Sequence, residues 1–263
     1  MEKIFDGKVV IVTGAAGGIG QELCRHFGAR GASIGALDNR DLVTGFVEEI
    51  REQGMEAAAA VADIGDADQT RAAIDSLVSA LGPADILINN AGFSDHPSLE
   101  KTTPDSWRDE VNGNLNGAYN CASAVLPGMK SRGAGVIINI GSVNGLSSFG
   151  DPAYSAAKAG LISYTKALAM EYGRFGIRAN IVCPGTVRTP IWEERMKRNP
   201  EILEQLVRWY PLRRVVEPRE VAGAVSFLAS DAASAISGVT LPVDCGLSAG
   251  NIIMSRELTL EEF

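Results

Sequence analysis

The sequence is poor in the residues that build metal sites and disulfide frameworks. Its 263 residues include only two histidines, His26 and His96. The four cysteines are far apart and form no CxxC pair: Cys24, Cys121, Cys183 and Cys245. A zinc site or a disulfide framework needs closely spaced ligands or cysteine pairs, so we expect neither and predict no metal cofactor.

The chain also lacks long hydrophobic runs and any excess of positive charge. No apolar run approaches the roughly 18 residues of a membrane-spanning helix, and the start, MEKIFDGKVV, has no apolar core of a signal peptide. With 24 basic and 32 acidic residues, the net charge of −8 argues against nucleic acid or an anionic membrane as the partner. We therefore expect a soluble protein of the reducing cytoplasm.

What the chain does contain is a regular alternation of short β-branched runs and stretches of helical periodicity. Several runs are apolar almost throughout, as expected of strands covered on both faces in a parallel sheet. The alternation predicts a single α/β domain over residues 1–263, with a doubly wound, Rossmann-type parallel sheet and helices on both faces. The predicted strands occupy residues 8–13, 33–38, 56–63, 85–89, 136–141, 177–184 and 240–244.

Two segments depart from this alternation. Residues 186–217 are rich in charged and aromatic residues and lie between a strand and a predicted helix. Long insertions after the carboxyl end of a strand usually cover a binding crevice, so we predict a substrate lid here. Residues 247–263 follow the last predicted strand and are either a frayed tail or an arm that reaches a neighbouring subunit.

The octet TGAAGGIG, residues 13–20, directly follows the first predicted strand and opens a helix. Its glycines at 14, 18 and 20 allow the backbone to turn sharply and to approach a pyrophosphate, which a helix N-terminus favours. The spacing is GxxxGxG rather than the commoner GxGxxG. A simple glycine-rich turn is the alternative, but the position between strand and helix favours a nucleotide site.

Asp38 ends the second predicted strand, 18 residues after Gly20. A carboxylate there can accept hydrogen bonds from both hydroxyls of an adenosine ribose and repels a 2′-phosphate, so it favours NAD over NADP. A helix N-cap is the alternative role for this aspartate. Arg40, two residues later, keeps a phosphate-binding role open.

The stretch PAYSAAKAG, residues 152–160, places Tyr154 and Lys158 four positions apart. Residues at i and i+4 lie on the same face of a helix, so the phenol and the ammonium can converge on one point. Such a pair also arises by chance, and its meaning depends on the rest of the chain.

Five motifs resemble, in order and spacing, those of the short-chain dehydrogenase/reductases in their single-domain, soluble branch. They are TGAAGGIG (13–20), NNAG (89–92), GS (141–142), YSAAK (154–158) and PG (184–185), and the likeness extends from about Gly7 to Gly246. This resemblance implies about seven parallel strands, a nicotinamide cofactor and hydride transfer at an alcohol or carbonyl carbon.

The resemblance also implies where the cofactor, expected to be NAD, binds. The implied positions are the diphosphate loop with Gly14, Gly18, Ile19 and Gly20; the ribose acid Asp38; Asp63 and Ile64 beside the adenine; Asn90, Ala91 and Gly92 beside the nicotinamide ribose; and Pro184, Gly185, Val187 and Thr189 at the carboxamide. Taken alone, NNAG and PG are more typical of simple turns.

For the chemistry, the resemblance implies four residues: Asn114, Ser142, Tyr154 and Lys158. A carbonyl that receives a hydride needs a proton at its oxygen, but a free tyrosine, with a pKa near ~10, is a poor acid/base at neutral pH. A nearby ammonium favours the phenolate, so we expect Lys158 to lower the pKa of Tyr154 and to bind the nicotinamide ribose. Ser142 is expected to orient the substrate oxygen, and Asn114 to anchor a water relay to the lysine.

The resemblance is weakest where the substrate binds. Predicted substrate contacts are Ser142, Asn144, Tyr154 and Trp192, with Ser94, His96 and Phe149 as further pocket walls. For those other than Ser142 and Tyr154, packing or a surface position is the alternative. Between Thr186 and Arg214 the lid carries seven basic residues against four glutamates: Arg188, Arg195, Lys197, Arg198, Arg208, Arg213 and Arg214. They are suited to an acidic substrate, but ordinary solvated helix charges explain them as well.

We therefore expect an NAD-dependent short-chain alcohol dehydrogenase or carbonyl reductase that interconverts a secondary alcohol and a ketone. The alternative is a non-catalytic nucleotide-sensing or scaffold protein on the same fold. Predicted helices over residues 104–130 and 152–172 carry small-residue faces suited to close contact across a dimer axis. By analogy with the family, we expect a homotetramer or a dimer.

Overall fold

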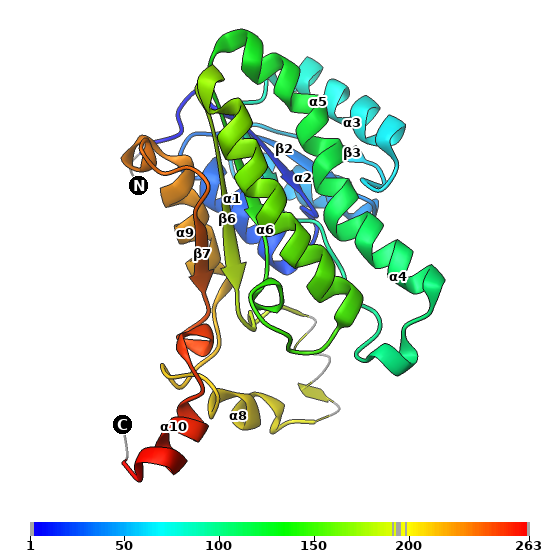
Figure 1. Cartoon of the computed structure of the whole chain (residues 1–263). Helices are drawn as coiled ribbons and strands as arrows, with labels where there is room; N and C mark the ends of the chain where they lie inside the picture. Colours follow the sequence, from blue (N-terminus) through cyan, green and yellow to red (C-terminus); the bar gives the residue numbers. More distant parts are fainter. Residues whose placement is uncertain (1–2, 191, 193–195, 198, 262–263) are drawn as a thin grey trace.

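The computed structural model describes residues 3–190, 192, 196–197 and 199–261. At its centre lies one sheet of seven parallel strands in the order β3-β2-β1-β4-β5-β6-β7 (Figure 1). The strands are β1 (Val9–Thr13), β2 (Ser33–Asp38), β3 (Ala57–Val61), β4 (Ile86–Asn89), β5 (Gly135–Ile140), β6 (Ile177–Pro184) and β7 (Thr240–Val243). The predicted fold class is confirmed, and each predicted strand coincides with an observed one.

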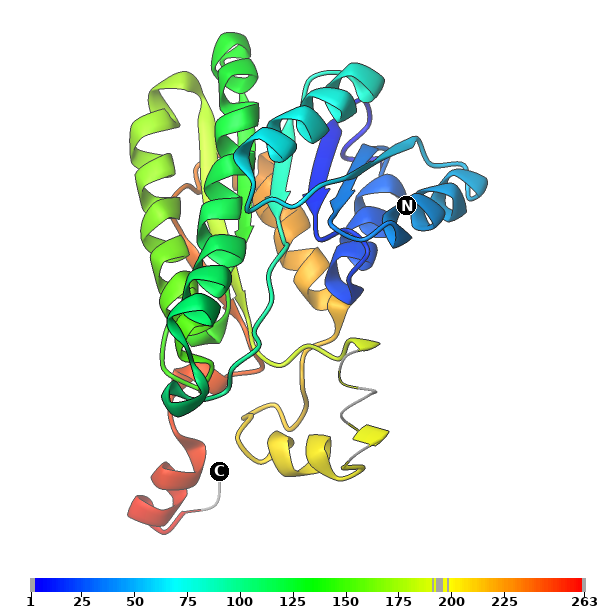
Figure 2. The same cartoon turned by 90° about the vertical axis from the view of Figure 1, so that its right-hand side faces the viewer.

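Helices cover both faces of this sheet (Figures 1 and 2). One layer consists of α1 (Gly18–Gly28), α2 (Leu42–Glu52) and α9 (Pro218–Ala229), and its apolar residues share a core with inward-facing strand residues. The other layer consists of α3 (Ala67–Leu81), α5 (Gly117–Arg132) and α6 (Pro152–Tyr172), and it builds the second core. Burial on both faces explains why the strands are apolar throughout rather than alternating.

Shorter helices connect these layers or lie at the ends of the sheet. They are α4 (Pro104–Val111), α8 (Ile202–Val207), α10 (Ile252–Thr259), the 3₁₀ turns η1 (Leu99–Lys101), η3 (Val143–Gly145), η4 (Gly173–Phe175), η5 (Asp231–Ala233) and η6 (Leu247–Ala249), and the π-helical turn η2 (Asn112–Asn116).

The single helix expected over residues 104–130 is wrong in one respect, because η2 interrupts it between α4 and α5. The sequence of this turn, NGNLN, combines three asparagines with a glycine, and these residues are poor helix formers. A π-helical turn widens the backbone and is frequent at functional sites. Here it carries Asn114, which is buried.

The topology creates a natural crevice at the carboxyl edge of the sheet. From β1 the chain runs outward through β2 and β3 and then returns to the other side of β1 as β4. The loops after β1 and β4 therefore diverge at this switch point, where ligands bind in open α/β sheets. In Figure 1 this edge faces the lower part of the view, toward α8.

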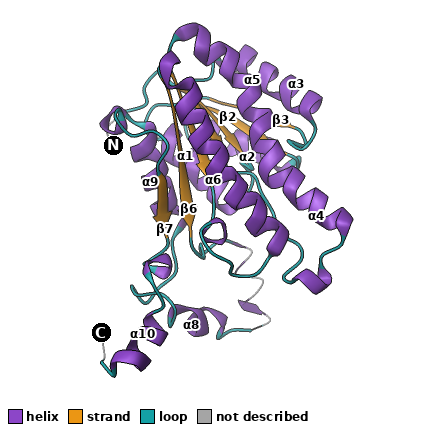
Figure 3. Cartoon of the chain, in the orientation of Figure 1, coloured by secondary structure: helices purple, strands orange, loops and turns teal. Residues whose placement is uncertain are grey.

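The segment 186–217 lies below this edge, drawn mostly as loop in Figure 3. A parallel bridge between Val187 and Val216 joins the two ends of this segment, and the buried side chains of Leu203 and Tyr210 pack into the core. Two of the basic residues noted in the sequence, Arg195 and Arg198, lie outside the described residues.

Beyond β7, η6 and α10 extend away from the sheet (Figures 1 and 2), and α10 has no buried residue. Within the described part of the chain, no helix is long and apolar enough to cross a membrane. The same residues contain no group of three or more histidine, cysteine or acidic side chains arranged to hold a metal ion.

Candidate active site

The glycine-rich loop joins β1 to α1 at the switch point. Gly14 has a φ of 63°, and a Cβ there would lie 2.8 Å from the Cα of Ala91, so only glycine fits. A Cβ on Gly20 would collide with the carbonyl oxygen of Gly14. α1 begins after Gly17, and its first turn contains no acidic residue and receives no side-chain cap. The N–H groups of this first turn are therefore available to an anion such as a pyrophosphate.

Asp38 is buried at the end of β2 and contacts the glycine-rich loop. Its Oδ2 accepts a hydrogen bond from the backbone N–H of Ala16 at 2.9 Å. Its Oδ1 accepts from the backbone N–H and the Nε of Arg40 at 3.1 and 3.0 Å. Arg40 is thus the ion-pair partner of Asp38. The alternative N-cap role does not apply, since α2 begins after Asp41.

The ends of β1 and β4 are clamped together by Thr13 and Asn90. The Thr13 hydroxyl accepts hydrogen bonds from the backbone N–H groups of Asn90 and Ala91, both at 3.0 Å. The Asn90 amide donates in return to the carbonyls of Thr13 and Gly14, at 2.9 and 3.2 Å. The NNAG segment and the glycine-rich loop therefore form one continuous wall, as two parts of a single cofactor site must.

Asp63 and Ile64 follow β3 and differ in what they can offer an adenine ring. Asp63 is exposed, and its Oδ1 accepts a hydrogen bond from the Gly65 N–H at 2.8 Å. The Ile64 side chain packs into the core against Gly117. Only the backbone of Ile64 can therefore reach a nucleotide.

The segment after β6 returns to the glycine-rich loop. Pro184 ends β6, and the N–H of Gly185 donates to the carbonyl of Val243 at 3.0 Å. A Cβ on Gly18 would lie 2.9 Å from Thr189 Cβ, so Thr189 borders the start of α1. Val187 is buried in its bridge to the end of the segment. The predicted diphosphate and carboxamide positions are thus neighbours in space.

Ser142 and Tyr154 meet at the carboxyl edge of β5. Ser142 is buried two residues beyond this strand, and its Oγ accepts a hydrogen bond from the Asn144 N–H at 3.1 Å. Tyr154 lies half-buried in the first turn of α6. A side-chain hydrogen bond joins the two residues. The pair predicted to hold the substrate oxygen is therefore brought together.

Lys158 lies one helical turn beyond Tyr154 and is 3% exposed. Its Nζ donates to the carbonyl of Ile140 at 2.9 Å and lies 5.4 Å from the centroid of the Tyr154 ring. A Cβ on Gly92 would lie 3.1 Å from this Nζ and 2.5 Å from Asn114 Oδ1, so both atoms border one small space. Asn114 Oδ1 is buried without a hydrogen-bond partner among the described residues. A buried oxygen without a protein partner is the kind of group that an ordered water satisfies.

The amide nitrogen of Asn114 fixes the orientation of that side chain. It donates to the carbonyls of Phe93 and Glu110 at 2.7 and 2.8 Å. The amide oxygen is thereby turned toward Lys158, and the π-helical turn supplies the displacement that this orientation needs.

The expected lowering of the Tyr154 pKa by Lys158 is wrong for the protein by itself. Burial raises the pKa of Tyr154 to about 12, although the hydrogen bond with Ser142 acts in the opposite direction. The negative charge of Asp151 adds to the rise. Burial also lowers the pKa of Lys158 to about 8, which the nearby Cys183 partly opposes. The protein alone therefore holds a neutral phenol beside a destabilised ammonium.

The other predicted substrate contacts differ in their burial and in the groups that they touch. The side-chain amide of Asn144 donates to the Gly150 carbonyl and the Ser155 hydroxyl, both at 3.1 Å, so it holds the loop after β5 in shape. Trp192 packs against the core cluster that includes α1 and α9. Ser94 and Phe149 are exposed, and His96 is half-buried.

Glu110 is the buried group that sequence reasoning missed. It is 1% exposed in the last turn of α4, and its carboxylate lies under the loop after β4. A second missed feature is a buried chain of hydrogen bonds from Asn89 to Asn139 and on to Thr165, each at 2.8 Å. The only sequence signal for Glu110 was an acidic residue four positions before Asn114, which is ordinary on a solvated helix face.

Together these groups can exchange a proton with an oxygen held between Ser142 and Tyr154. The glycine-rich loop and Asp38 fit the diphosphate and a ribose of a dinucleotide. The residues present therefore fit a nicotinamide cofactor, and the proton-exchanging groups lie along the same edge of the sheet.

Comparison with known proteins agrees with this arrangement. Residues 14–248 match a family profile described as Enoyl-(Acyl carrier protein) reductase. The chain is 45% identical, over 257 residues, to a protein of Schizosaccharomyces pombe named Uncharacterized oxidoreductase C922.06, covering 97% of this chain and 96% of that protein.

Solved structures are similar over nearly the whole chain. An oxidoreductase of the short chain dehydrogenase/reductase family from Burkholderia thailandensis has a TM-score of 0.91 and 49% identity, covering 97% of this chain and 98% of that one. A gluconate 5-dehydrogenase from Burkholderia cenocepacia J2315, solved with NADP and tartrate, has a TM-score of 0.89 and 34% identity, covering 95% and 98%.

Proposed function

Because the chain belongs to the short-chain dehydrogenase/reductase family of oxidoreductases, we propose that it uses NAD to interconvert a secondary alcohol and a ketone. The single observation that carries this proposal is the convergence of Ser142, Tyr154, Lys158 and Asn114 at the carboxyl edge of β5. The substrate is a small molecule bound between the loops after β4 and β5 and the segment 186–217.

In the oxidation direction, the Tyr154 phenolate acts as the general base for the alcohol proton, and Ser142 donates a hydrogen bond to the same oxygen. In the reduction direction Tyr154 returns the proton as an acid. Lys158 stabilises the phenolate by its charge, and a water bound to the unpartnered Oδ1 of Asn114 gives the proton a route to solvent. Bound nicotinamide supplies the hydride donor or acceptor and, when oxidised, a positive charge that favours the phenolate.

NAD is proposed rather than NADP because of Asp38. Its carboxylate is buried beside the glycine-rich loop, where it can receive ribose hydroxyls and repels a 2′-phosphate. The NADP-bound gluconate 5-dehydrogenase shows that a protein of this fold at 34% identity can hold the phosphorylated cofactor, so the preference must come from local residues such as this one.

The alternative of a non-catalytic nucleotide sensor is disfavoured by the energetics of Lys158. Burying an ammonium in a core costs free energy, and it lowers the pKa of this lysine to about 8. A non-catalytic scaffold gains nothing from a buried lysine whose pKa is lowered, whereas an enzyme that transfers a proton can use one.

We also propose a homo-oligomer in the cytoplasm. The outward face of α5 and α6 exposes Tyr119 and Met170 and contains a hollow of about 460 Å³ with Tyr164 and Tyr172 in its wall. An apolar, aromatic-lined surface of this kind suits helix–helix contact with a second copy.

The test of the proposed reaction is reduced-cofactor formation by the purified protein with NAD or NADP. The substrate panel contains secondary alcohols, sugars, steroids and hydroxy acids. We expect turnover of at least one class, with NAD preferred. Absence of turnover with every substrate and both cofactors, in a protein that still binds NAD, would favour the sensor instead.

A further inference from the structure

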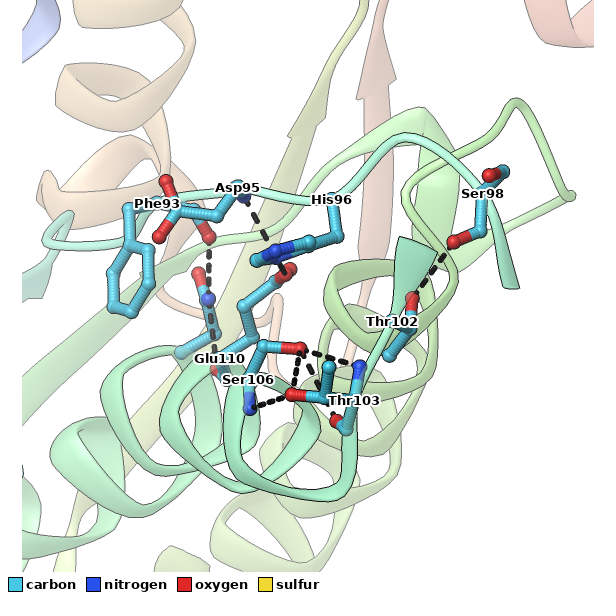
Figure 4. Close-up of polar contacts among 9 residues, drawn as sticks. Phe93, Asp95, His96, Ser98, Thr102, Thr103, Ser106 and Glu110 are labelled. Atoms are coloured by element: carbon cyan, nitrogen blue, oxygen red, sulfur yellow. Dashed lines mark hydrogen bonds and ion pairs between the residues drawn. The ribbon is translucent and has the colours of Figure 1, made fainter. Parts of the chain in front are cut away.

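The carboxylate of Glu110 is buried and incompletely paired (Figure 4). Its Oε1 accepts a hydrogen bond from the Asp95 N–H at 3.4 Å and lies 3.7 Å from His96 Nδ1. Its Oε2 and the Nδ1 of His96 are both buried and have no hydrogen-bond partner among the described residues. The carboxylate and the imidazole therefore face each other through Oε1 and Nδ1.

His96 is the only basic side chain within ion-pairing distance of Glu110 in the described part of the chain. A buried carboxylate is strongly unfavourable unless a positive charge or hydrogen bonds compensate it. His96 supplies that charge when both ring nitrogens carry protons. In this pair Nδ1–H faces Glu110 at ion-pair distance, and Nε2–H is left as a charged donor.

The Nε2 of His96 points away from Glu110. The His96 side chain is 33% exposed, and Nε2 is not among the buried atoms that lack a partner, while Nδ1 is. None of the hydrogen bonds between described residues involves Nε2. This donor is therefore open to a ligand.

The loop that carries His96 lies beside the catalytic groups. It follows β4, next to the strand that leads to Ser142. The adjacent carbonyl of Pro97 accepts a hydrogen bond at 3.3 Å from the N–H of Asp151, the residue before α6, and Tyr154 is in the first turn of that helix. On the opposite side of β5, the segment after β6 contributes the exposed Arg188. The loops on the two sides of Ser142 and Tyr154 thus each carry a basic residue.

We propose that His96 is a substrate-binding residue, positioned by Glu110, and that it binds a carboxylate of the substrate remote from the carbinol carbon. The substrate class is then a hydroxy acid and the corresponding keto acid. A charged donor that binds an anion in a partly desolvated crevice gives a short, strong hydrogen bond. This inference rests on the proposed oxidoreductase function and narrows its substrate.

The backbone of Glu110 contacts Asn114 of the proton relay, while its side chain positions His96. The test must separate these two roles. The relay contact runs from the Asn114 amide to the backbone carbonyl of Glu110, and a side-chain substitution retains that carbonyl. His96→Asn keeps a polar group that can face Glu110 but removes the outward nitrogen. Glu110→Gln keeps the size of the side chain and removes its charge. Ser98→Ala, two positions beyond His96 on the same loop, is the matched control, because only its backbone carbonyl takes part in the local hydrogen bonds between described residues.

The experiment measures kcat and KM with NAD for hydroxy acids of increasing chain length and for their methyl esters. We expect the wild type to prefer at least one acid over its ester by about tenfold or more in kcat/KM. In His96→Asn the KM for that acid should rise by about tenfold while its kcat and the KM for the ester change less than about threefold. Glu110→Gln should raise the same KM, and the double variant should be no worse than His96→Asn alone.

Several results would overturn the inference. One is a wild type that uses esters as well as acids; another is a His96→Asn variant whose KM rises equally for both. A Glu110→Gln variant with an unchanged KM for the acid would remove the positioning role. Thermal unfolding and NAD affinity of each variant identify loss of folding, and Ser98→Ala should match the wild type. Turnover of neutral alcohols without a preference for acids refutes only this inference, whereas no turnover of any alcohol refutes the proposed function.

Discussion

The two halves of the crevice differ in how completely their polar groups are paired. On the nucleotide side, around β1 and β2, Asp38 and Thr13 each receive at least two hydrogen bonds from the backbone or from Arg40. On the chemical side, between β4 and α5, lie most of the buried polar atoms that have no partner among the described residues: those of Asn89, His96, Glu110 and Asn114. The remaining one, on Thr240, is in β7.

The difference indicates what each half is built to do. A paired, rigid wall is preorganised for a ligand that is the same in every turnover, which suits a dinucleotide. Unpaired buried groups are unfavourable in the free protein and are compensated by water, by the substrate or by the reacting proton. The unpaired groups of the chemical half therefore lower the stability of the free protein but are available for the reaction. Substitutions in the two halves should differ in their effects on stability and on activity.

The largest expected effect is the loss of activity in Tyr154→Phe. Removal of the phenolic oxygen eliminates the general acid/base, so kcat should fall by about 10³-fold or more. The nucleotide half is untouched, so the dissociation constant for NAD, measured by fluorescence titration, should stay within about twofold of the wild type. Tyr164→Phe, elsewhere on α6, should retain activity, and substantial turnover by Tyr154→Phe would assign the proton transfer to another group.

Lys158→Met should reduce activity and yet raise stability. Below pH 8 the buried ammonium carries the full free-energy cost of a pKa that falls from 10.5 in the unfolded chain to about 8 in the folded protein. That cost is about 3 kcal/mol, and loss of the hydrogen bond to Ile140 offsets about 1 kcal/mol of it. We expect kcat to fall by about 10²-fold and the free energy of unfolding at pH 7 to rise by about 2 kcal/mol.

The pH dependence of the free energy of unfolding tests independently whether the Lys158 ammonium destabilises the fold. Between pH 8 and 10.5 the folded state binds fewer protons at Lys158 than the unfolded state, so the lysine's penalty disappears as the pH rises. Burial raises the pKa of the Cys24 and Cys121 thiols, which lowers stability over the same range in every variant, so the difference between variants carries the test. Chemical denaturation from pH 7 to 9.5 should show the advantage of Lys158→Met over the wild type shrink by about 2 kcal/mol, while the control Lys166→Met, whose lysine is exposed, stays parallel to the wild type. A constant difference in stability between Lys158→Met and the wild type would assign the pH dependence to other groups.

The same contrast explains which features the sequence could predict. The strands, the glycine-rich loop and the positions of Tyr154 and Lys158 follow from short-range patterns, in which hydrophobic runs and i, i+4 spacing act locally. The π-helical turn and the burial of Glu110 depend on contacts with Phe93 and Asp95, which lie fifteen or more positions away. The raised pKa of Tyr154 could not be predicted from the sequence either, because it results from burial that outweighs the neighbouring charge.

An intermediate effect is expected for Asn114→Ala. The variant loses both the oxygen that faces Lys158 and the amide bonds that hold the carbonyls of Phe93 and Glu110. We expect kcat to fall by about 10- to 100-fold, with a modest loss of thermal stability. Asn116→Ala, in the same π-helical turn, is the control, because its amide donates only to Asn112. If both variants lose activity equally, the turn rather than the relay is responsible.

The smallest effects should come from the nucleotide half, at Asp38 and Arg40. Asp38→Ala removes the acceptor for ribose hydroxyls and the charge that repels a 2′-phosphate, so the ratio of kcat/KM for NAD to that for NADP should fall by about tenfold. Arg40→Ala should change the ratio in the opposite direction by about threefold, since it leaves the carboxylate without its neutralising partner.

The opposite signs make this pair of substitutions a test of how the two residues act. If Arg40 binds a 2′-phosphate independently of Asp38, the effects of the two substitutions add in the double variant. If Arg40 acts by neutralising Asp38, as their 3.0 Å ion pair indicates, Arg40→Ala has no further effect once Asp38 is alanine. Rates of the four proteins with saturating alcohol and varied cofactor distinguish the two cases. Activity of Asp38→Ala with its better cofactor should remain close to that of the wild type, because the proton-transfer groups lie in the other half of the crevice.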